Sequence, residues 1–251
     1  MFLFIRLYLA HLIADYPLQT DKIYQLKVRS NFGLLIHAGI AALMTLVFMW
    51  PFLNHYETWL FAIMIWISHA IQDKIKLLHS AKHQRSNNVY GYCLDQIFHL
   101  LFVAIVFLTP LKNWISPKSP SLWLSWYYSD ALIYFLIGFL LSTWSATYFI
   151  GSFKETFLKK ELQTPYFTKI DKYYGIVERS LFFTLSYVCT IWAVILIPLL
   201  FFIRILYSNW QIKKSNQYCM RGFIIDGAMG LIVSFILGKL VFHFIGYCIF
   251  S

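Results

Sequence analysis

The chain has 251 residues, of which 59% are hydrophobic, 20% aromatic and only 13% charged. A soluble domain of this length covers its surface with far more charge, so the composition excludes an ordinary soluble enzyme. The formal net charge of +10 would suggest nucleic-acid binding in a soluble protein. Here the basic residues lie in short loops between apolar runs, as in membrane proteins, so nucleic acid is not an expected partner.

The long apolar runs predict an all-α fold, a polytopic bundle of about six to eight transmembrane helices. Open strands would leave backbone groups unpaired in hydrocarbon, and the alternating pattern of a membrane barrel is absent from the sequence. We expect a single transmembrane domain over residues 1–251. Within it, residues 1–109 would form a four-helix half that bears the polar site, and residues 129–251 would hold the remaining helices.

The predicted helices follow the apolar runs in chain order. The first runs from about Phe2 to Tyr16 and ends before Pro17, whose ring blocks continuation. It lacks the basic start and small-residue cleavage site of a signal peptide, so we expect it to be retained, although it is short for a span. The other helices are expected at about Gly33–Phe52, Glu57–Leu78, Gly91–Thr109, Ser129–Ile150, Ser180–Tyr207 and Gly222–Phe250.

The distribution of Lys and Arg predicts the topology. The loops after the first, third and fifth helices are the basic ones, which places them in the cytoplasm and the N-terminus on the opposite side of the membrane. Lys213, Lys214 and Arg221 would then lie outside if residues 180–207 crossed once. A re-entrant hairpin bent near Tyr187–Ile191 would return them to the cytoplasm, and both readings stay open.

Three predicted helices each carry a histidine and an aspartate four residues apart, and therefore on one helix face. The order is reversed on the fourth helix, as antiparallel neighbours require if the pairs are to meet at one depth. A further histidine lies in the first turns of the second helix. These groups are His11, Asp15, His37, His69, Asp73, Asp95 and His99, and we expect all of them in one layer beneath the cytoplasmic face.

Imidazole and carboxylate together are the ligands of zinc, and also of non-haem iron and manganese. The pattern predicts a divalent metal site, with zinc first and iron or manganese as alternatives. Seven groups exceed one tetrahedral site, so some would orient ligands or a second metal would bind. A proton pathway and purely structural polar packing are the alternatives. The expected metal ligands are His11, His37, His69, Asp73 and His99, with Asp15 and Asp95 as catalytic groups.

Three polar residues are candidates for binding the substrate. Gln19 and Lys22 follow Pro17 and could fold over the mouth of the site, and Arg179 precedes an apolar block. Their side chains suit a phosphate or a lipid headgroup. Lys76 has the same chemistry, but we interpret it as an ordinary cytoplasmic charge.

Several motifs resemble the bacterial integral membrane family catalogued as domain of unknown function 3307. They are HLIADYPLQTDK at 11–22, LIH at 35–37, HAIQDKIK at 69–76, LDQIFHL at 94–100 and GIVER at 175–179. The resemblance implies no activity. More distantly the chain is similar to membrane-bound metal-dependent hydrolases, which place His and Asp at helix ends, and zinc amidases of the alkaline ceramidase type offer a chemical analogy.

These observations together predict a membrane-embedded metal-dependent hydrolase that acts on a lipid or lipid-linked substrate at the cytoplasmic leaflet. A transporter or metal-ion carrier that uses the same residues is the alternative. An iron-dependent lipid oxidase is disfavoured, because the histidine-rich boxes of such enzymes are missing.

Overall fold

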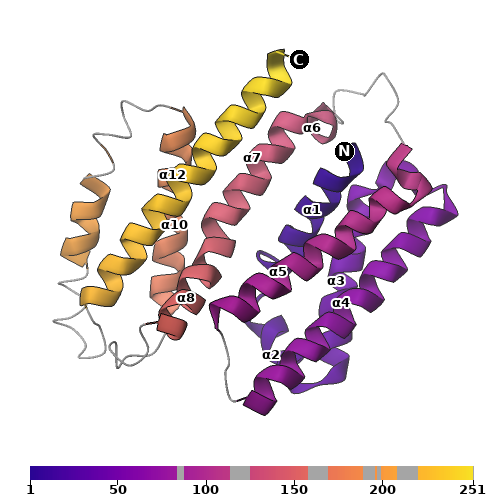
Figure 1. Ribbon diagram of the computed structural model, residues 1–251, viewed down its shortest axis with the longest axis horizontal. Coiled ribbons are helices and arrows are strands. Elements are labelled where there is room, and N and C mark those ends of the chain that lie inside the picture. Colours follow the sequence, from indigo (N-terminus) through magenta and orange to yellow (C-terminus); the bar gives the residue numbers. More distant parts are fainter. Residues whose placement is uncertain are drawn as a thin grey trace. The chain divides into compact units, whose positions relative to one another are not determined.

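A computed structural model describes residues 1–83, 88–113, 125–157, 169–188, 196, 199–207 and 220–250. Every regular element in these ranges is helical, as expected. The longer helices are α1 (Phe2–Asp15), α2 (Asp21–Arg29), α3 (Asn31–Phe48), α4 (Tyr56–His83), α5 (Val89–Ala104), α7 (Asp130–Leu140), α8 (Ala146–Phe157), α10 (Lys169–Val188) and α12 (Met220–Phe250) (Figure 1). The shorter ones are η1 (Trp50–Phe52), η2 (Ile105–Leu108), η3 (Pro110–Asn113), α6 (Ser125–Tyr128) and the π-helical turn η5 (Leu141–Ser145).

Four of the described helical segments are long and apolar enough to cross a membrane, which indicates a membrane protein. The expected count of six to eight spans is therefore met only in part. Helix α1 is too short at 14 residues, and polar side chains interrupt the apolar run of α4. The four segments are Asn31–Phe48, Val89–Leu108, Asp130–Phe157 and Gly222–Gly246.

The path of residues 180–207 stays a prediction. Helix α10 continues to Val188, and residues 199–207 are helical. The bend expected near Tyr187–Ile191 falls largely on residues 189–195, which lie outside the described ranges.

The chain forms two compact units. The first comprises Met1–Ser86 and Tyr90–Ile137, and the second comprises Asn87–Val89 and Gly138–Ser251. The single transmembrane domain with halves at residues 1–109 and 129–251 stays a prediction. All seven groups of the predicted polar layer belong to the first unit.

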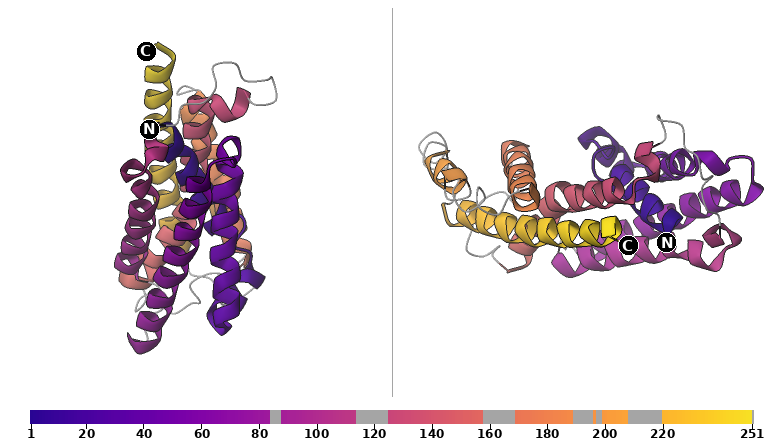
Figure 2. Two further views of the ribbon diagram at one scale, coloured as in Figure 1. Left: turned by 90° about the vertical axis from the view of Figure 1, so that its right-hand side faces the viewer. Right: turned by 90° about the horizontal axis from the view of Figure 1, so that it is seen from above.

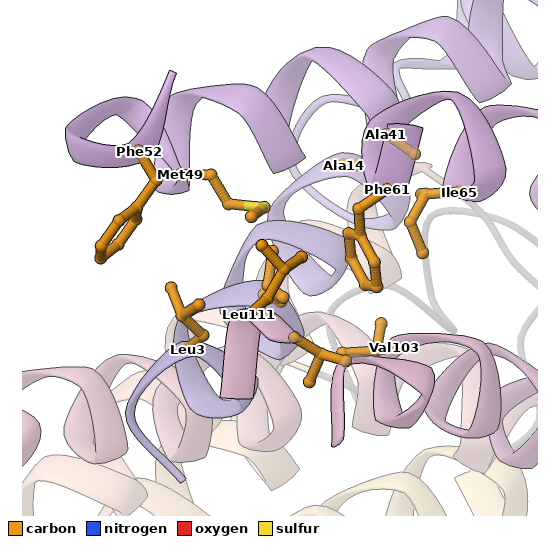
Figure 3. Close-up of a cluster of buried hydrophobic side chains, with 11 residues drawn as sticks. Leu3, Ala14, Ala41, Met49, Phe52, Phe61, Ile65, Val103 and Leu111 are labelled. Atoms are coloured by element: carbon orange, nitrogen blue, oxygen red, sulfur yellow. The ribbon is translucent and has the colours of Figure 1, made fainter. Parts of the chain in front are cut away.

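Helix α1 lies in the core of the first unit. Its apolar residues point in every direction, the pattern of a helix that is buried rather than exposed on one side. It packs against α3, η2 and η3. Figure 3 shows Leu3 and Ala14 of α1 in one cluster with Ile65 of α4 and Val103 of α5. The apolar side chains of this short helix are therefore buried against the surrounding helices of the first unit.

The N-terminal end of α1 is held in place by a buried arginine, Arg6. Arg6 Nη1 lies 2.8 Å from Asp130 Oδ1, and Arg6 Nε donates to Tyr127 O at 2.8 Å. The guanidinium carbon is 3.4 Å from the centre of the Phe2 ring, a cation–π contact. These partners compensate for burial of the charge.

The segment between α1 and α3 contains a helix that was not expected. Thr20 Oγ1 accepts from Ile23 N at the start of α2, and Ser30 Oγ accepts from Gly33 N at the start of α3. Both are ordinary N-caps. Gly33 lets the two helices meet closely, since a Cβ there would overlap the Leu26 carbonyl.

In the second unit, α10 and α12 pack along each other (Figures 1 and 2). Glycines of α12 allow close approach, Gly230 and Gly238 toward α10 and Gly227 toward the helical residues 199–207. A Cβ on Gly227 would come within 2.6 Å of Arg204 Cδ, and one on Gly230 within 3.3 Å of Arg179 Cγ. A Cβ on Gly238 would overlap Ser186 Oγ and lie 3.1 Å from Phe183 O.

Replacing Gly238 by alanine should therefore destabilise the second unit. We expect Gly238→Ala to cost about 1–3 kcal/mol, because the added methyl group must separate two packed helices. Thermal unfolding of the full chain in detergent measures the loss. Gly246→Ala on the same helix is the control, since nothing lies within 4 Å of its added Cβ. Equal melting temperatures for the two variants would contradict the packing.

Candidate metal centre

All seven groups of the predicted polar layer meet in the first unit. Helix α1 contributes two of them at its C-terminal end, α3 contributes one in its second turn, and α4 and α5 contribute two each. None of the seven side chains is more than 11% exposed. They are His11 and Asp15, His37, His69 and Asp73, and Asp95 and His99.

Asp15 lies at the centre of the cluster. Its Oδ1 is 3.5 Å from His37 Nε2 and 3.4 Å from His69 Nε2. Its Oδ2 is 3.6 Å from His11 Nε2 and 3.7 Å from His99 Nε2. Four imidazoles therefore face one carboxylate, two on each oxygen.

Asp73 faces His37 and His69, the two histidines nearest to Asp15 Oδ1. Its Oδ2 lies 3.4 Å from His69 Nε2 and 3.6 Å from His37 Nε2. Its other oxygen, Oδ1, lies 2.7 Å from Lys27 Nζ on α2. The pair is buried, with the Lys27 and Asp73 side chains 11% and 2% exposed.

Asp95 has a similar position beside His99, one of the two histidines nearest to Asp15 Oδ2. Its Oδ1 is 3.6 Å from His99 Nε2, and its Oδ2 accepts from Lys76 Nζ at 2.6 Å. Gln72 Nε2 donates to the Asp95 main-chain oxygen at 2.8 Å, which ties α4 to α5. Each outer carboxylate thus points one oxygen at the histidines and the other at a lysine.

Several of the inward-facing atoms lack hydrogen-bond partners. Buried donors and acceptors in proteins are nearly always paired, and each unpaired one costs about 1–3 kcal/mol. Two ligand atoms bound to one ion at about 2.1 Å are about 3.0 Å apart at a right angle and about 3.4 Å apart at the tetrahedral angle. The separations of 3.4–3.7 Å in the cluster are close to these values. The unpartnered atoms include His11 Nε2, Asp15 Oδ1, Asp73 Oδ2 and Asp95 Oδ1.

Overlapping sets of donor atoms could each hold an ion. His11, Asp15, His69 and His99 offer four atoms that all lie within 4.8 Å of one another. His37, His69 and Asp73 form a second set, and Asp73, Asp95 and His99 form a third. His69 Nε2 and His37 Nε2 are only 3.1 Å apart, so either one donates to the other or both face the same ion.

An apolar cavity of about 10 Å³ adjoins the histidines, near the lower limit for one water molecule. His11, His69 and His99 form its polar side. Its other walls come from Ser68, next to His69, and from residues one or two turns farther along the helices, in the direction of the apolar core. They are Leu7, Ala41, Thr45, Phe61, Ile65, Ser68, Phe102 and Val103.

The three predicted substrate-binding residues lie in different surroundings. Gln19 Oε1 accepts from Lys27 Nζ at 3.4 Å, next to the cluster. Lys22 is exposed on α2, and no ion pair joins it to the cluster within the described ranges. Arg179 belongs to the second unit, where it donates to Thr143 O at 3.3 Å and to Thr147 Oγ1. A role for these residues in binding substrate stays a prediction.

Two lysines of the site were not anticipated from the sequence. Lys76 pairs with Asp95, although we interpreted it as an ordinary cytoplasmic charge. Its position was informative, because it lies three residues after Asp73 and seven after His69, on the same helix face. Lys27 gave no such signal, because its contact depends on the fold of α2 back onto the other helices.

The second unit carries further charged residues that pair with one another. Lys154 Nζ lies 2.7 Å from Asp226 Oδ2. Glu178 pairs with Arg204. Such pairing lowers the cost of burying charge between helices.

The model of the family described as "Protein of unknown function (DUF3307)" matches residues 3–125. This range contains the whole cluster and both lysines, and the match supports the resemblance to that family noted in the motifs. No curated protein and no solved structure matches the chain. Nothing in these comparisons supports the more distant resemblance to metal-dependent hydrolases.

The buried pair of Lys27 and Asp73 gives a direct test of the site's electrostatics. We expect Lys27→Met to destabilise chelator-treated protein by about 3–5 kcal/mol, because it leaves a buried carboxylate uncompensated. Adding Zn²⁺ or Mn²⁺ should restore much of the loss, since a bound cation replaces the missing charge. Denaturant unfolding in detergent measures both effects.

Two further variants complete this test. The double variant Lys27→Met/Asp73→Asn should recover most of the stability without metal, since both charges are gone. Lys22→Met, on the exposed side of α2, should change stability by less than about 0.5 kcal/mol. A Lys27→Met protein as stable as the parent would show that the Lys27–Asp73 pair does not contribute to the free energy of unfolding.

Proposed function

We propose that the protein is a multi-pass enzyme of the bacterial inner membrane, a metal-dependent hydrolase that acts on a lipid or lipid-linked substrate at the cytoplasmic leaflet. The observation that carries this proposal is the buried cluster of four histidines and three aspartates, in which four inward-facing atoms, one on His11 and one on each aspartate, lack hydrogen-bond partners. Structural polar packing would instead be expected to pair such atoms with each other. A cation is the simplest partner for all of them.

The ligand chemistry favours a divalent ion. Four imidazoles and three carboxylates suit zinc best, and iron or manganese next. His11, His69, His99 and Asp15 form the set with the most donors, four, among the described residues. When bound, such an ion lowers the pKa of a coordinated water to about 7 and polarises a carbonyl or phosphoryl oxygen.

The protein's own residues would complete the chemistry. Asp95 Oδ1 is buried and unpartnered, so it can accept the proton that an attacking water gives up. Lys76 holds the other oxygen of Asp95 and thereby fixes the direction of Oδ1. Burial of the cluster excludes bulk water, which strengthens every charge interaction within it.

The position of the cluster supports a membrane-borne substrate. His11 and Asp15 occupy the last turn and a half of α1, and His37 lies in the second turn of α3. Lys27 and Lys76 lie at the same end of the first unit, as expected for a cytoplasmic face. A substrate could therefore reach the site from the headgroup layer while its apolar part stays in the bilayer.

We expect the purified full chain to release headgroup or fatty acid from vesicles of phosphatidylethanolamine, phosphatidylglycerol and cardiolipin. The release should require Zn²⁺ or Mn²⁺ and stop with EDTA. His69→Ala should lower the rate at least about a hundredfold, because it removes a donor at the centre of the cluster. Mass spectrometry of the products follows the reaction.

His79→Ala is the matched control, since His79 lies on the same helix but is exposed. It should retain both metal content and rate. If the metal-loaded protein released nothing from any of these lipids but carried metal into proteoliposomes, the hydrolase would be excluded in favour of a carrier. A protein that binds no divalent metal would point to structural packing.

A further inference from the structure

The two oxygens of Asp15 divide the four histidines into two pairs. His37 and His69 lie 3.5 and 3.4 Å from Oδ1. His11 and His99 lie 3.6 and 3.7 Å from Oδ2. A carboxylate in this position can offer one oxygen to each of two ions, and His69 lies between the two pairs, since its donor atom is also within 4.8 Å of those of His11 and His99.

We propose that the cluster holds two divalent cations bridged by the Asp15 carboxylate, and that the enzyme's substrate is a phosphate ester. The two-cation site rests on geometry alone, whereas the choice of substrate also rests on the proposed hydrolase. Two metal ions about 3.5–4 Å apart are typical of phosphatases, nucleases and aminopeptidases, and in the first two classes they act together on one phosphoryl group.

The first cation has four protein donors. His37 Nε2, His69 Nε2 and Asp73 Oδ2 form one set of donors. Asp15 Oδ1, the proposed fourth donor, lies 3.5 Å from His37 Nε2 and 3.4 Å from His69 Nε2. The two nitrogens are 3.1 Å apart. Four donors leave this ion little room for other ligands, which suits an ion that holds the bridge and the substrate in place.

The second cation has three firm donors and one open side. His11 Nε2, His99 Nε2 and Asp15 Oδ2 face one another, and the open side is toward Asp95, whose Oδ1 lies 3.6 Å from His99 Nε2. Catalytic metal sites commonly have three protein ligands and one open position. Asp95 is therefore positioned to take a proton from a water in that position.

Lys27 and Lys76 each pair with one oxygen of a carboxylate at the edge of the cluster. Lys27 occupies Asp73 Oδ1 and Lys76 occupies Asp95 Oδ2, so each aspartate can offer only its inner oxygen to an ion. The lysines also offset two of the three carboxylate charges. Two divalent cations would then leave the cluster with a formal excess of three positive charges, and a phosphate anion is the ligand that best balances it.

Hydrolysis of the phosphate ester requires no reactant other than water. The oxygen of water forms a bond to phosphorus while the ester P–O bond breaks, and the leaving alcohol oxygen takes up a proton. Asp95 accepts the proton from the attacking water and returns it to the solvent or to the leaving alcohol. The products are an alcohol and the shortened phosphate.

Metal counting tests the two-cation site without reference to activity. Metal-depleted full-length protein in detergent is titrated with Mn²⁺, freed of unbound metal by gel filtration, and analysed by elemental mass spectrometry and electron paramagnetic resonance. We expect two ions per chain and a signal from a spin-coupled pair. One ion per chain, or two ions with isolated-ion signals, would overturn the bridge.

Substitutions then assign the ions to their ligands. Asp73→Asn and His99→Ala should each reduce the count from two ions to one. Asp15→Asn should abolish the coupled signal, and His79→Ala should leave both count and signal unchanged. Gel filtration and circular dichroism confirm that each variant is folded. An Asp15→Asn protein that is folded and still shows the coupled pair would refute the assignment.

The substrate class is tested separately with p-nitrophenyl phosphate, bis(p-nitrophenyl) phosphate and p-nitrophenyl acetate. We expect turnover of a phosphate ester, inhibition by inorganic phosphate, and no metal-dependent cleavage of the acetate. A two-cation protein that cleaves only the acetate, or none of the three, would refute the phosphate-ester assignment but not the bridge. Hydrolysis by a protein with one ion would refute the bridge but not the hydrolase.

Discussion

The first unit depends on how a membrane protein buries the carboxylate of Asp15. An isolated charge in an apolar interior costs several kcal/mol, so it needs compensation from whatever surrounds it. Two lysines neutralise the two outer aspartates, but Asp15 faces only imidazole nitrogens. The central carboxylate is thus the one acid of the cluster without a permanent cation beside it, and this imbalance is what makes the cluster suited to binding metal.

The arrangement of helices follows from assembling that cluster. Helix α1 ends at Asp15, one residue before Tyr16 and two before Pro17, so its last turn lies at the same level as His37, one turn and a half into α3. Helix α2 then turns back and brings Lys27 to Asp73 on α4. Four helices and a short connecting helix therefore each contribute at least one charged or polar group to a single layer, with the apolar cluster of Figure 3 packed alongside it.

The sequence was most informative where a residue's role depends on helical spacing. Pairs four residues apart placed His69 with Asp73 and Asp95 with His99 on single faces, and the reversed order on α5 correctly implied a common depth. Spacing says nothing about contacts made by a chain reversal, so Lys27 and the existence of α2 were missed. The number of spans was also difficult to predict, because α1 is a largely apolar helix but has only 14 residues, fewer than a span needs. Its burial among α3, η2 and η3 depends on packing, which apolar composition alone does not give.

Helix α1 is anchored at both ends, at Arg6 by Asp130 and Tyr127 and at His11 and Asp15 by the cluster. The distance between the two anchors is set by the number of residues between them. One extra residue would turn one anchor by about 100° and shift it by about 1.5 Å relative to the other. The number of residues from Arg6 to Asp15 is therefore fixed by the two anchors. Natural variation should change the apolar side chains of this segment, whereas selection should eliminate insertions and deletions within it.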